Sequence, residues 1–155
     1  MNGVLLRHLA RNNGFIARLL TGVGTLEAVT LHGRCNSIAW IAGHLAHNRA
    51  GLLRLVGVDD PAEAWEAQVR RGGAKIADPG ADLATLQAVF VRRGARFAET
   101  LPTVAPARLA EPCGTRLPDG GTTVAAAIEF LLFHETFHLG QLDLLRVALG
   151  LPGIP

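Results

Sequence analysis

The stretch that decides the fold is "HETFHLGQLDLLRVALG", which runs from His134 to Gly150. In it, and in the preceding "AAAIEFLLF", apolar residues recur at the three- and four-residue spacing of an amphipathic α-helix. Thr122 or Thr123 can cap the start of this helix, and the glycine ends it. We therefore predict a long C-terminal helix that carries His134 and His138 one turn apart.

Three more helices are predicted upstream of this one. Apolar residues recur at helical spacing from Val4 to Leu20, from about Ser37 to Val56, and from the cap residue Asp82 to the Leu101-Pro102 pair. The sequence shows no alternating strand pattern, internal repeat or low-complexity tract. These segments predict an all-α, up-and-down four-helix bundle, with residues 1–155 forming a single domain.

Two of the connections between these helices are long and rich in turn residues. Residues 57–81 include Pro61 to Arg71, which we expect to form one or two helical turns outside the bundle. Residues 102–121 favour a small hairpin across Pro118-Asp119-Gly120. We expect both connections to form walls of a pocket.

Composition excludes several classes of partner. The formal net charge is +2 and the arginines are scattered, so the sequence has no basic footprint for nucleic acid. Its first residues, "MNGVLLRHLARNNGFIARLL", lack both the apolar run of a membrane span and the cleavage site of a signal peptide. Cys35 and Cys113 stand far apart without C-x-x-C spacing, which favours reduced thiols. We predict a cytoplasmic protein with neither nucleic acid nor a membrane as partner.

The two histidines of the last helix predict a metal site. His134 and His138 fall on an apolar face, so both rings should point into the bundle. Two titratable rings side by side in a low-dielectric core are costly to bury, and a shared metal ion removes that cost. The residues of this predicted face are Ala127, Phe130, Leu131, Leu142, Leu145 and Leu149.

The second helix supplies a third ligand. In "WIAGHLAHNRAG", His44 lies at the edge of the apolar stripe, whereas His47 is turned roughly 60° further toward solvent. We therefore predict His44 as a ligand and His47 as a surface residue, and we place His8 and His32 outside the site. Three neutral imidazoles with an open fourth position are typical of a catalytic metal site. Zn²⁺ or Ni²⁺ is the expected ion, with Fe²⁺ as a further option.

Several polar neighbours are candidates for supporting the ligands. Asn12, Asn48 and Gln141 lie on or near core faces, where they can orient a ligand. Glu135 is offset by roughly 100° from His134, so it either approaches the metal site from the flank or is solvated. We favour the solvated position, and we assign no catalytic residue.

Residues His134 to His138 also match the H-E-x-x-H pattern of zinc metalloproteases, whose glutamate is a general base. Those enzymes place the helix beneath a sheet whose edge strand holds the substrate, and this sequence offers no such strand. After His138 the sequence does not continue as H-x-x-G-x-x-H. A zinc metalloprotease is therefore the last-ranked function.

Two motifs carry a resemblance to a known family. "GHLAH", Gly43 to His47, and "HETFHLGQLDLLRVALG" resemble the DinB-like superfamily of small bacterial metal-binding four-helix proteins, and the resemblance extends from Leu5 to Pro152. It implies a three-histidine site on His44, His134 and His138, the same residues that helical spacing selects. In that family the residue after the first histidine of the last helix is not a fixed glutamate, which argues against a protease-type base there.

The resemblance also implies chemistry with low-molecular-weight thiols, because the family includes thiol-dependent S-transferases and maleylpyruvate isomerases. We predict a metal-dependent enzyme that acts on a small molecule through such a thiol, with Arg49 or Arg70 binding an anionic substrate. The alternative is a non-catalytic metal-binding stress-response protein, because both kinds of site use the same ligands.

One face of the second helix predicts a homodimer. Opposite the apolar stripe lies a band of small and apolar residues that we expect no neighbour within a four-helix bundle to cover. Small side chains let two helices approach closely. The band consists of Ala39, Gly43, Ala46, Ala50 and Leu53.

Overall fold

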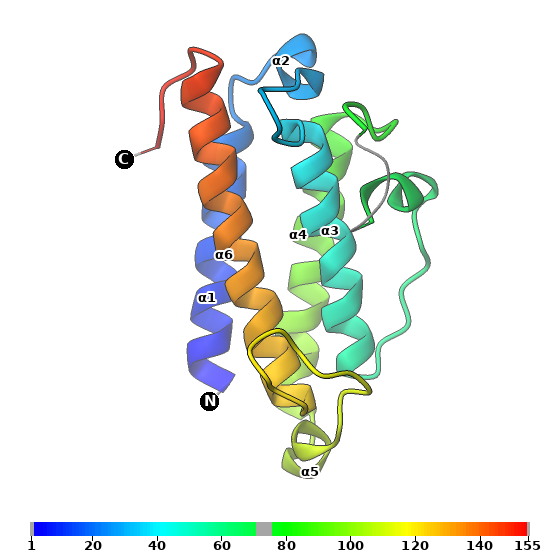
Figure 1. The fold of residues 1–155 in the computed structure, drawn as a ribbon. Helices are drawn as coiled ribbons and strands as arrows, with labels where there is room; N and C mark the ends of the chain where they lie inside the picture. The colour runs from blue at the N-terminus through cyan, green and yellow to red at the C-terminus, as the bar shows by residue number, and fades with distance from the viewer. Residues whose placement is uncertain (1, 71–75, 155) are drawn as a thin grey trace.

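A computed structural model describes residues 2–70 and 76–154. Its long helices lie side by side (Figure 1) and match the predicted segments to within a few residues at each end. The described residues form no strand, and their only bridge joins Pro112 to Thr123. The all-α four-helix class is thus confirmed. The long helices are α1 (Asn2–Leu20), α3 (Ile38–Leu55), α4 (Leu83–Thr100) and α6 (Val124–Ala148).

Side-chain caps begin three of these helices, and those at Asp82 and Thr123 are at predicted positions. Ser37 accepts a hydrogen bond from the backbone N–H of Trp40, and Thr123 accepts one from that of Ala126. Asp82 accepts from the N–H of Thr85 at 2.7 Å, and this bonding lowers the pKa of its carboxyl group. Each cap satisfies a backbone donor that the first helical turn leaves without a partner.

The order of the helices differs from the simple alternation of an up-and-down bundle. Gly43 faces Leu86 and Arg49 reaches the carbonyl of Phe90, so α3 and α4 run in the same direction. Both run opposite to α1 and α6, as Figure 1 shows. Two neighbouring parallel helices require a connection as long as the bundle itself, and the sequence between α3 and α4, residues 56–82, is long enough for one.

Short helices occupy the connections. The predicted turns at Pro61 to Arg71 are found as the 3-10 helix η1 (Ala64–Val69), and Arg71 lies outside the described residues. The predicted hairpin near Pro118 is also found, because the N–H of Leu117 donates to the carbonyl of Gly121 at 2.8 Å. The other short elements are α2 (Thr25–Val29), η2 (Leu101–Thr103) and α5 (Pro106–Ala110).

The predicted dimer surface on α3 is covered within the chain. All its residues are buried, because α4 and η1 lie against this side of the helix. The expectation that no neighbour covers the band is wrong, and the cause is the parallel α4 together with the connection that precedes it. The homodimer stays a prediction, but it has lost the surface from which it was inferred.

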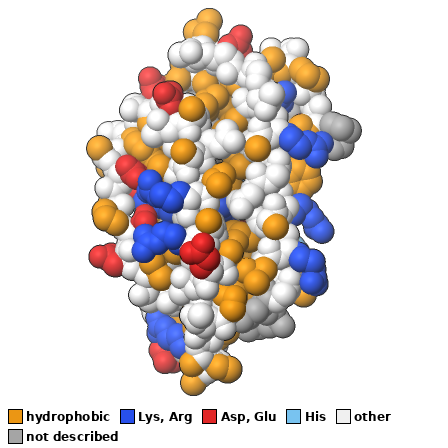
Figure 2. All heavy atoms as spheres, turned by 180° about the vertical axis from the view of Figure 1, so that it is seen from behind, with side chains coloured by type: hydrophobic (Ala, Val, Ile, Leu, Met, Phe, Trp, Pro, Cys, Tyr) orange, Lys and Arg blue, Asp and Glu red, His pale blue; other side chains and the backbone are white. Residues whose placement is uncertain are grey.

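Charged side chains of both signs lie on the face of the molecule that Figure 2 shows, where they are interspersed with apolar ones. Cys35 and Cys113 are free cysteines, as predicted. Within residues 2–70 and 76–154, no helix combines the length and hydropathy that crossing a membrane requires.

Candidate metal centre

Three histidine rings from two helices converge on one point. Nε2 of His134 lies 3.1 Å from Nε2 of His44 and 3.1 Å from Nε2 of His138. One ligand atom from each residue lies within 4.8 Å of the others. Ligands of a tetrahedral Zn²⁺ lie about 3.3 Å apart, because each Zn–N bond is about 2.0–2.1 Å long. The structure therefore brings the three predicted ligands together at a spacing close to that of a metal site.

Hydrogen bonds at the far side of two rings determine which nitrogen faces the centre. Nδ1 of His44 lies 2.8 Å from the carbonyl oxygen of Val69, which can only accept, so this nitrogen carries the proton. Nδ1 of His138 lies 2.7 Å from Oε1 of Gln141, the supporting residue predicted for this helix. Both rings therefore present an unprotonated Nε2. The role of Val69 could not be predicted, because a backbone carbonyl leaves no signal in the sequence.

The donor set fits a divalent cation. The lone pairs of His44 and His138 both face Nε2 of His134, and a single proton can bridge only two of these nitrogens. One cation accepts all three lone pairs, and imidazole nitrogen suits Zn²⁺, Ni²⁺ and Fe²⁺. Across the described ranges, these histidines are the one group of His, Cys, Asp or Glu residues placed to hold a metal.

The electrostatics of the centre keep His138 neutral. Burial, followed by the charges of His134 and His44, lowers the pKa of His138 from 6.5 to about 4, against an opposing effect of Gln141. A neutral imidazole is the form that binds a metal. At neutral pH the ring is therefore ready to act as a ligand.

This pKa predicts how the metal-free protein responds to acid. An unfolded histidine titrates near pH 6.5, whereas folded His138 titrates near pH 4, so the folded state binds fewer protons between these values. The resulting stability is complete above pH 6.5 and is lost as the pH falls toward 4. We expect His138→Gln to flatten this part of the pH profile in urea unfolding with EDTA present. An unchanged profile would contradict the assignment.

The three rings form part of the wall of an open pocket of about 930 Å³. Its lining combines aromatic and aliphatic side chains with Arg34, Arg70, Cys35 and the exposed His32. No aspartate or glutamate is among its described lining residues. The apolar lining residues are Trp40, Ile41, Pro118, Phe130, Phe137, Leu144, Leu145 and Ala148.

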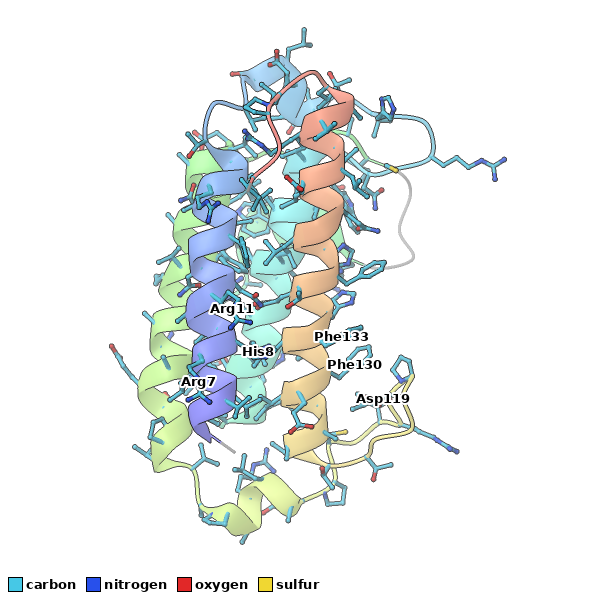
Figure 3. All side chains as sticks on the ribbon, turned by 90° about the vertical axis from the view of Figure 1, so that its left-hand side faces the viewer. Arg7, His8, Arg11, Asp119, Phe130 and Phe133 are labelled. Atoms are coloured by element: carbon cyan, nitrogen blue, oxygen red, sulfur yellow. The ribbon has the colours of Figure 1, made fainter. Side chains whose placement is uncertain are left out.

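Among the described residues, the three-histidine group includes neither Asn48, a predicted supporting residue, nor His8 and His47, which were predicted to lie outside the site. No hydrogen bond joins Asn48 to the three rings within the described part of the chain, and its buried Nδ2 has no partner. His8 is exposed on α1, and Figure 3 shows it on the other side of α6 from Phe130 and Phe133. His47 is not a surface residue, because only 21% of its side chain is exposed and its Nδ1 lies 2.6 Å from Oε2 of Glu66.

The buried face of α6 also differs from the predicted one. His134 and His138 are half-buried at its edge, beside the pocket, rather than at its centre. Apolar residues occur all around α6, and Phe133, Phe137 and Leu144 are exposed, so periodicity alone could not orient the helix. The residues that are in fact buried are Val124, Ala127, Ile128, Leu132, Glu135, Leu139, Leu142, Leu145 and Arg146.

Glu135 occupies the centre of that face, which corrects two predictions. It is fully buried, and its carboxylate accepts from Nε of Arg49 at 2.8 Å, from Nη2 of Arg49 at 3.0 Å and from Asn12 at 3.0 Å. It is therefore neither solvated nor beside the metal site, and Arg49 is not free to bind a substrate. Since Glu135 does not line the pocket, the structure lacks the water-activating base of an H-E-x-x-H protease.

Several further contacts hold the buried guanidinium group of Arg49 in place. Nη1 donates to Asn13 and to the carbonyl of Phe90, and the guanidinium lies 3.2 Å from the centroid of the Phe90 ring. A Cβ atom at Gly94 would overlap the guanidinium, so only glycine fits there. This ion pair was missed because charged residues in a helix usually indicate an exposed face.

Comparisons with known proteins agree with this fold. The family sequence model of the DinB superfamily matches residues 18–142. The structure is similar to that of YfiT from Bacillus subtilis, described as a probable metal-dependent hydrolase with an unusual four-helix bundle topology. That match has a TM-score of 0.70 and 15% identity, and covers 97% of this chain and 88% of YfiT. No curated protein sequence matches significantly. Since the family model covers most of the sequence, the chain belongs to the DinB superfamily.

Proposed function

We propose that the protein is a metal-dependent enzyme that activates a low-molecular-weight thiol for reaction with a small electrophile, as an S-transferase or isomerase does. The observation that carries this proposal is the convergence of three Nε2 atoms in the wall of an open pocket. A divalent cation in that position lowers the pKa of a water or thiol that reaches it. His44, His134 and His138 would hold the cation, and Zn²⁺ or Ni²⁺ is the proposed ion.

The lining of the pocket favours a thiol over water as the nucleophile. Hydrolysis is assisted by a group that accepts a proton from water, and apart from the three ligands the described lining offers the exposed His32 but no carboxylate for this. A thiol has a pKa of about 8.5 and loses its proton far more readily than water does. The pocket therefore suits a reactant that needs less help from a general base than water does. Metal-dependent hydrolysis, the activity suggested for YfiT, is the second candidate.

The same lining indicates the kind of electrophile. Phe130 and Phe137 offer an apolar surface next to the histidines. Arg34 and Arg70 form no ion pair within the described part of the chain, so their charges are available to a ligand. We propose a substrate with an apolar body and an anionic group, with Arg70 rather than Arg49 as the residue that binds the anion.

Turnover assays with and without metal test this function. Protein loaded with Zn²⁺ or Ni²⁺ should consume electrophiles when glutathione, bacillithiol or mycothiol is present, and EDTA should abolish the reaction. Cys35→Ala is the control, because it removes a protein thiol that lines the pocket and should leave a reaction of the added thiol unchanged. Turnover that needs metal but no thiol would support hydrolysis instead. Bound metal without turnover on a broad panel would support the non-catalytic alternative.

A further inference from the structure

We propose that η1, the short helix between α3 and α4, positions the metal ligand His44, and that Glu66 is the positioning residue that holds η1 in place. The inference rests on the proposed metal function. Its starting point is the hydrogen bond from Nδ1 of His44 to the carbonyl of Val69, the last residue of η1. Such a bond sets the direction of the ring and the nitrogen that stays unprotonated.

Close approach of η1 to α3 depends on a glycine next to the ligand. A Cβ atom at Gly43 would lie 2.9 Å from Cγ1 of Val69 and 3.5 Å from Cζ3 of Trp65. The first of these distances is too short for two carbon atoms, so a side chain here would push η1 outward. Val69 is fully buried in this contact, and Trp65 is 7% exposed. Glycine at residue 43 therefore lets η1 pack close enough to α3 for the carbonyl of Val69 to reach His44.

Glu66 ties the same short helix to both neighbouring long helices. Only 2% of it is exposed, and its Oε2 lies 2.6 Å from Nδ1 of His47 on α3. Its Oε1 accepts from Nη2 of Arg93 on α4 at 2.6 Å and from the backbone N–H of Glu63 at 3.0 Å. Burial alone raises the pKa of Glu66, but the bonds from His47, Glu63 and Arg93 outweigh it and lower the pKa. The carboxylate is thus ionised and fully bonded.

Arg93 extends this anchorage to the rest of the connection. It is fully buried, and its guanidinium donates to Asp60 at 2.6 Å and to the carbonyl of Ala46 at 2.9 Å. The residues just before η1 and Glu66 within it are therefore fixed to α4. Loss of the Glu66 charge would release the middle of this segment while His134 and His138, on α6, keep their places.

Two variants act on η1 by different routes. Glu66→Gln weakens its electrostatic anchorage, and Gly43→Ala displaces it by steric overlap with Val69. We expect each to weaken Zn²⁺ binding by about 10–100-fold, the usual effect of losing a group that orients a ligand. Adding Val69→Ala to Gly43→Ala removes the overlapping Cγ1 atom and should restore much of the affinity.

Gly51→Ala is the matched control. It lies on the same helix, but its Cβ would meet nothing closer than Cδ1 of Leu131 at 3.7 Å, an ordinary contact. Competition with a chromogenic chelator measures Zn²⁺ affinity, and the visible spectrum of Co²⁺-loaded protein reports the geometry of the ligands. The spectrum should change in Glu66→Gln and Gly43→Ala and should stay as in the wild type in Gly51→Ala.

The possible results separate this inference from the proposed function. Wild-type affinity and an unchanged Co²⁺ spectrum in either folded variant would overturn the positioning role and leave the metal site intact. A wild-type protein that binds neither Zn²⁺ nor Co²⁺ would overturn both. Gly43→Ala also replaces glycine by a better helix former, so weaker metal binding without loss of stability would show that the effect is not general destabilisation.

Discussion

Glu135→Gln should destabilise the protein by about 3–5 kcal/mol, because it leaves a buried charge without its partner. The side chain of Arg49 is completely buried, and that of Glu135 is 1% exposed. Glutamine keeps the shape of glutamate but cannot neutralise the guanidinium. Urea unfolding of metal-free protein would measure the loss directly.

Two controls show whether this loss arises from the buried pair. Glu111→Gln breaks the exposed ion pair with Arg108, in which the Arg108 side chain is 41% exposed and the Glu111 side chain 53%. This change should lower the free energy of unfolding by about 1 kcal/mol or less. The double change Arg49→Met with Glu135→Leu removes both charges and should recover much of the stability. If Glu135→Gln were as stable as the wild type but inactive, Glu135 would have a chemical role that its position does not support.

Replacing His134 by alanine should abolish the stabilisation of the protein by metal. With free Zn²⁺ at a hundredfold excess over its dissociation constant, the wild type should gain about 2.7 kcal/mol. In a chain of this size, that gain raises the melting temperature by about 5–11 °C. His134 has the largest effect because its Nε2 is the atom adjacent to both other ligands.

Calorimetry with and without Zn²⁺ measures this effect. His8→Ala is the control, since His8 is exposed on α1 and is not a member of the three-histidine group. The melting temperature of this variant should rise with Zn²⁺ as that of the wild type does. An equal rise in His134→Ala would show that Zn²⁺ stabilises the protein from another place. Absence of a rise in the wild type would favour three histidines that bind no metal.

The parts of this structure that follow from local rules could be predicted. The caps at Ser37, Asp82 and Thr123 satisfy neighbouring backbone groups, and the four-residue spacing of His134 and His138 places both rings on one side of a helix. These features depend on a few residues close in the chain. The same locality explains why all of the long helices were located from periodicity and turn residues.

The features that escaped prediction depend on contacts between distant segments. A connection of the length of residues 56–82 allows α4 to run either way, so its direction had to come from the structure. The partnership of Arg49 and Glu135 joins residues on different helices, and each alone resembles an ordinary surface charge. The acceptor for His44 is a main-chain oxygen, whose position no residue type specifies.

The parallel arrangement of α3 and α4 has a consequence for how the chain folds. Helices joined by a tight turn can associate as soon as they form, whereas these two must first close a loop that spans the bundle, at an entropic cost. The interface between α3 and α4 should therefore form late in folding. The three-histidine centre should reach its full affinity for metal only after this interface has formed. A chain in which this loop was cut to a tight turn would reverse α4, and the carbonyl that orients His44 would be lost with the loop.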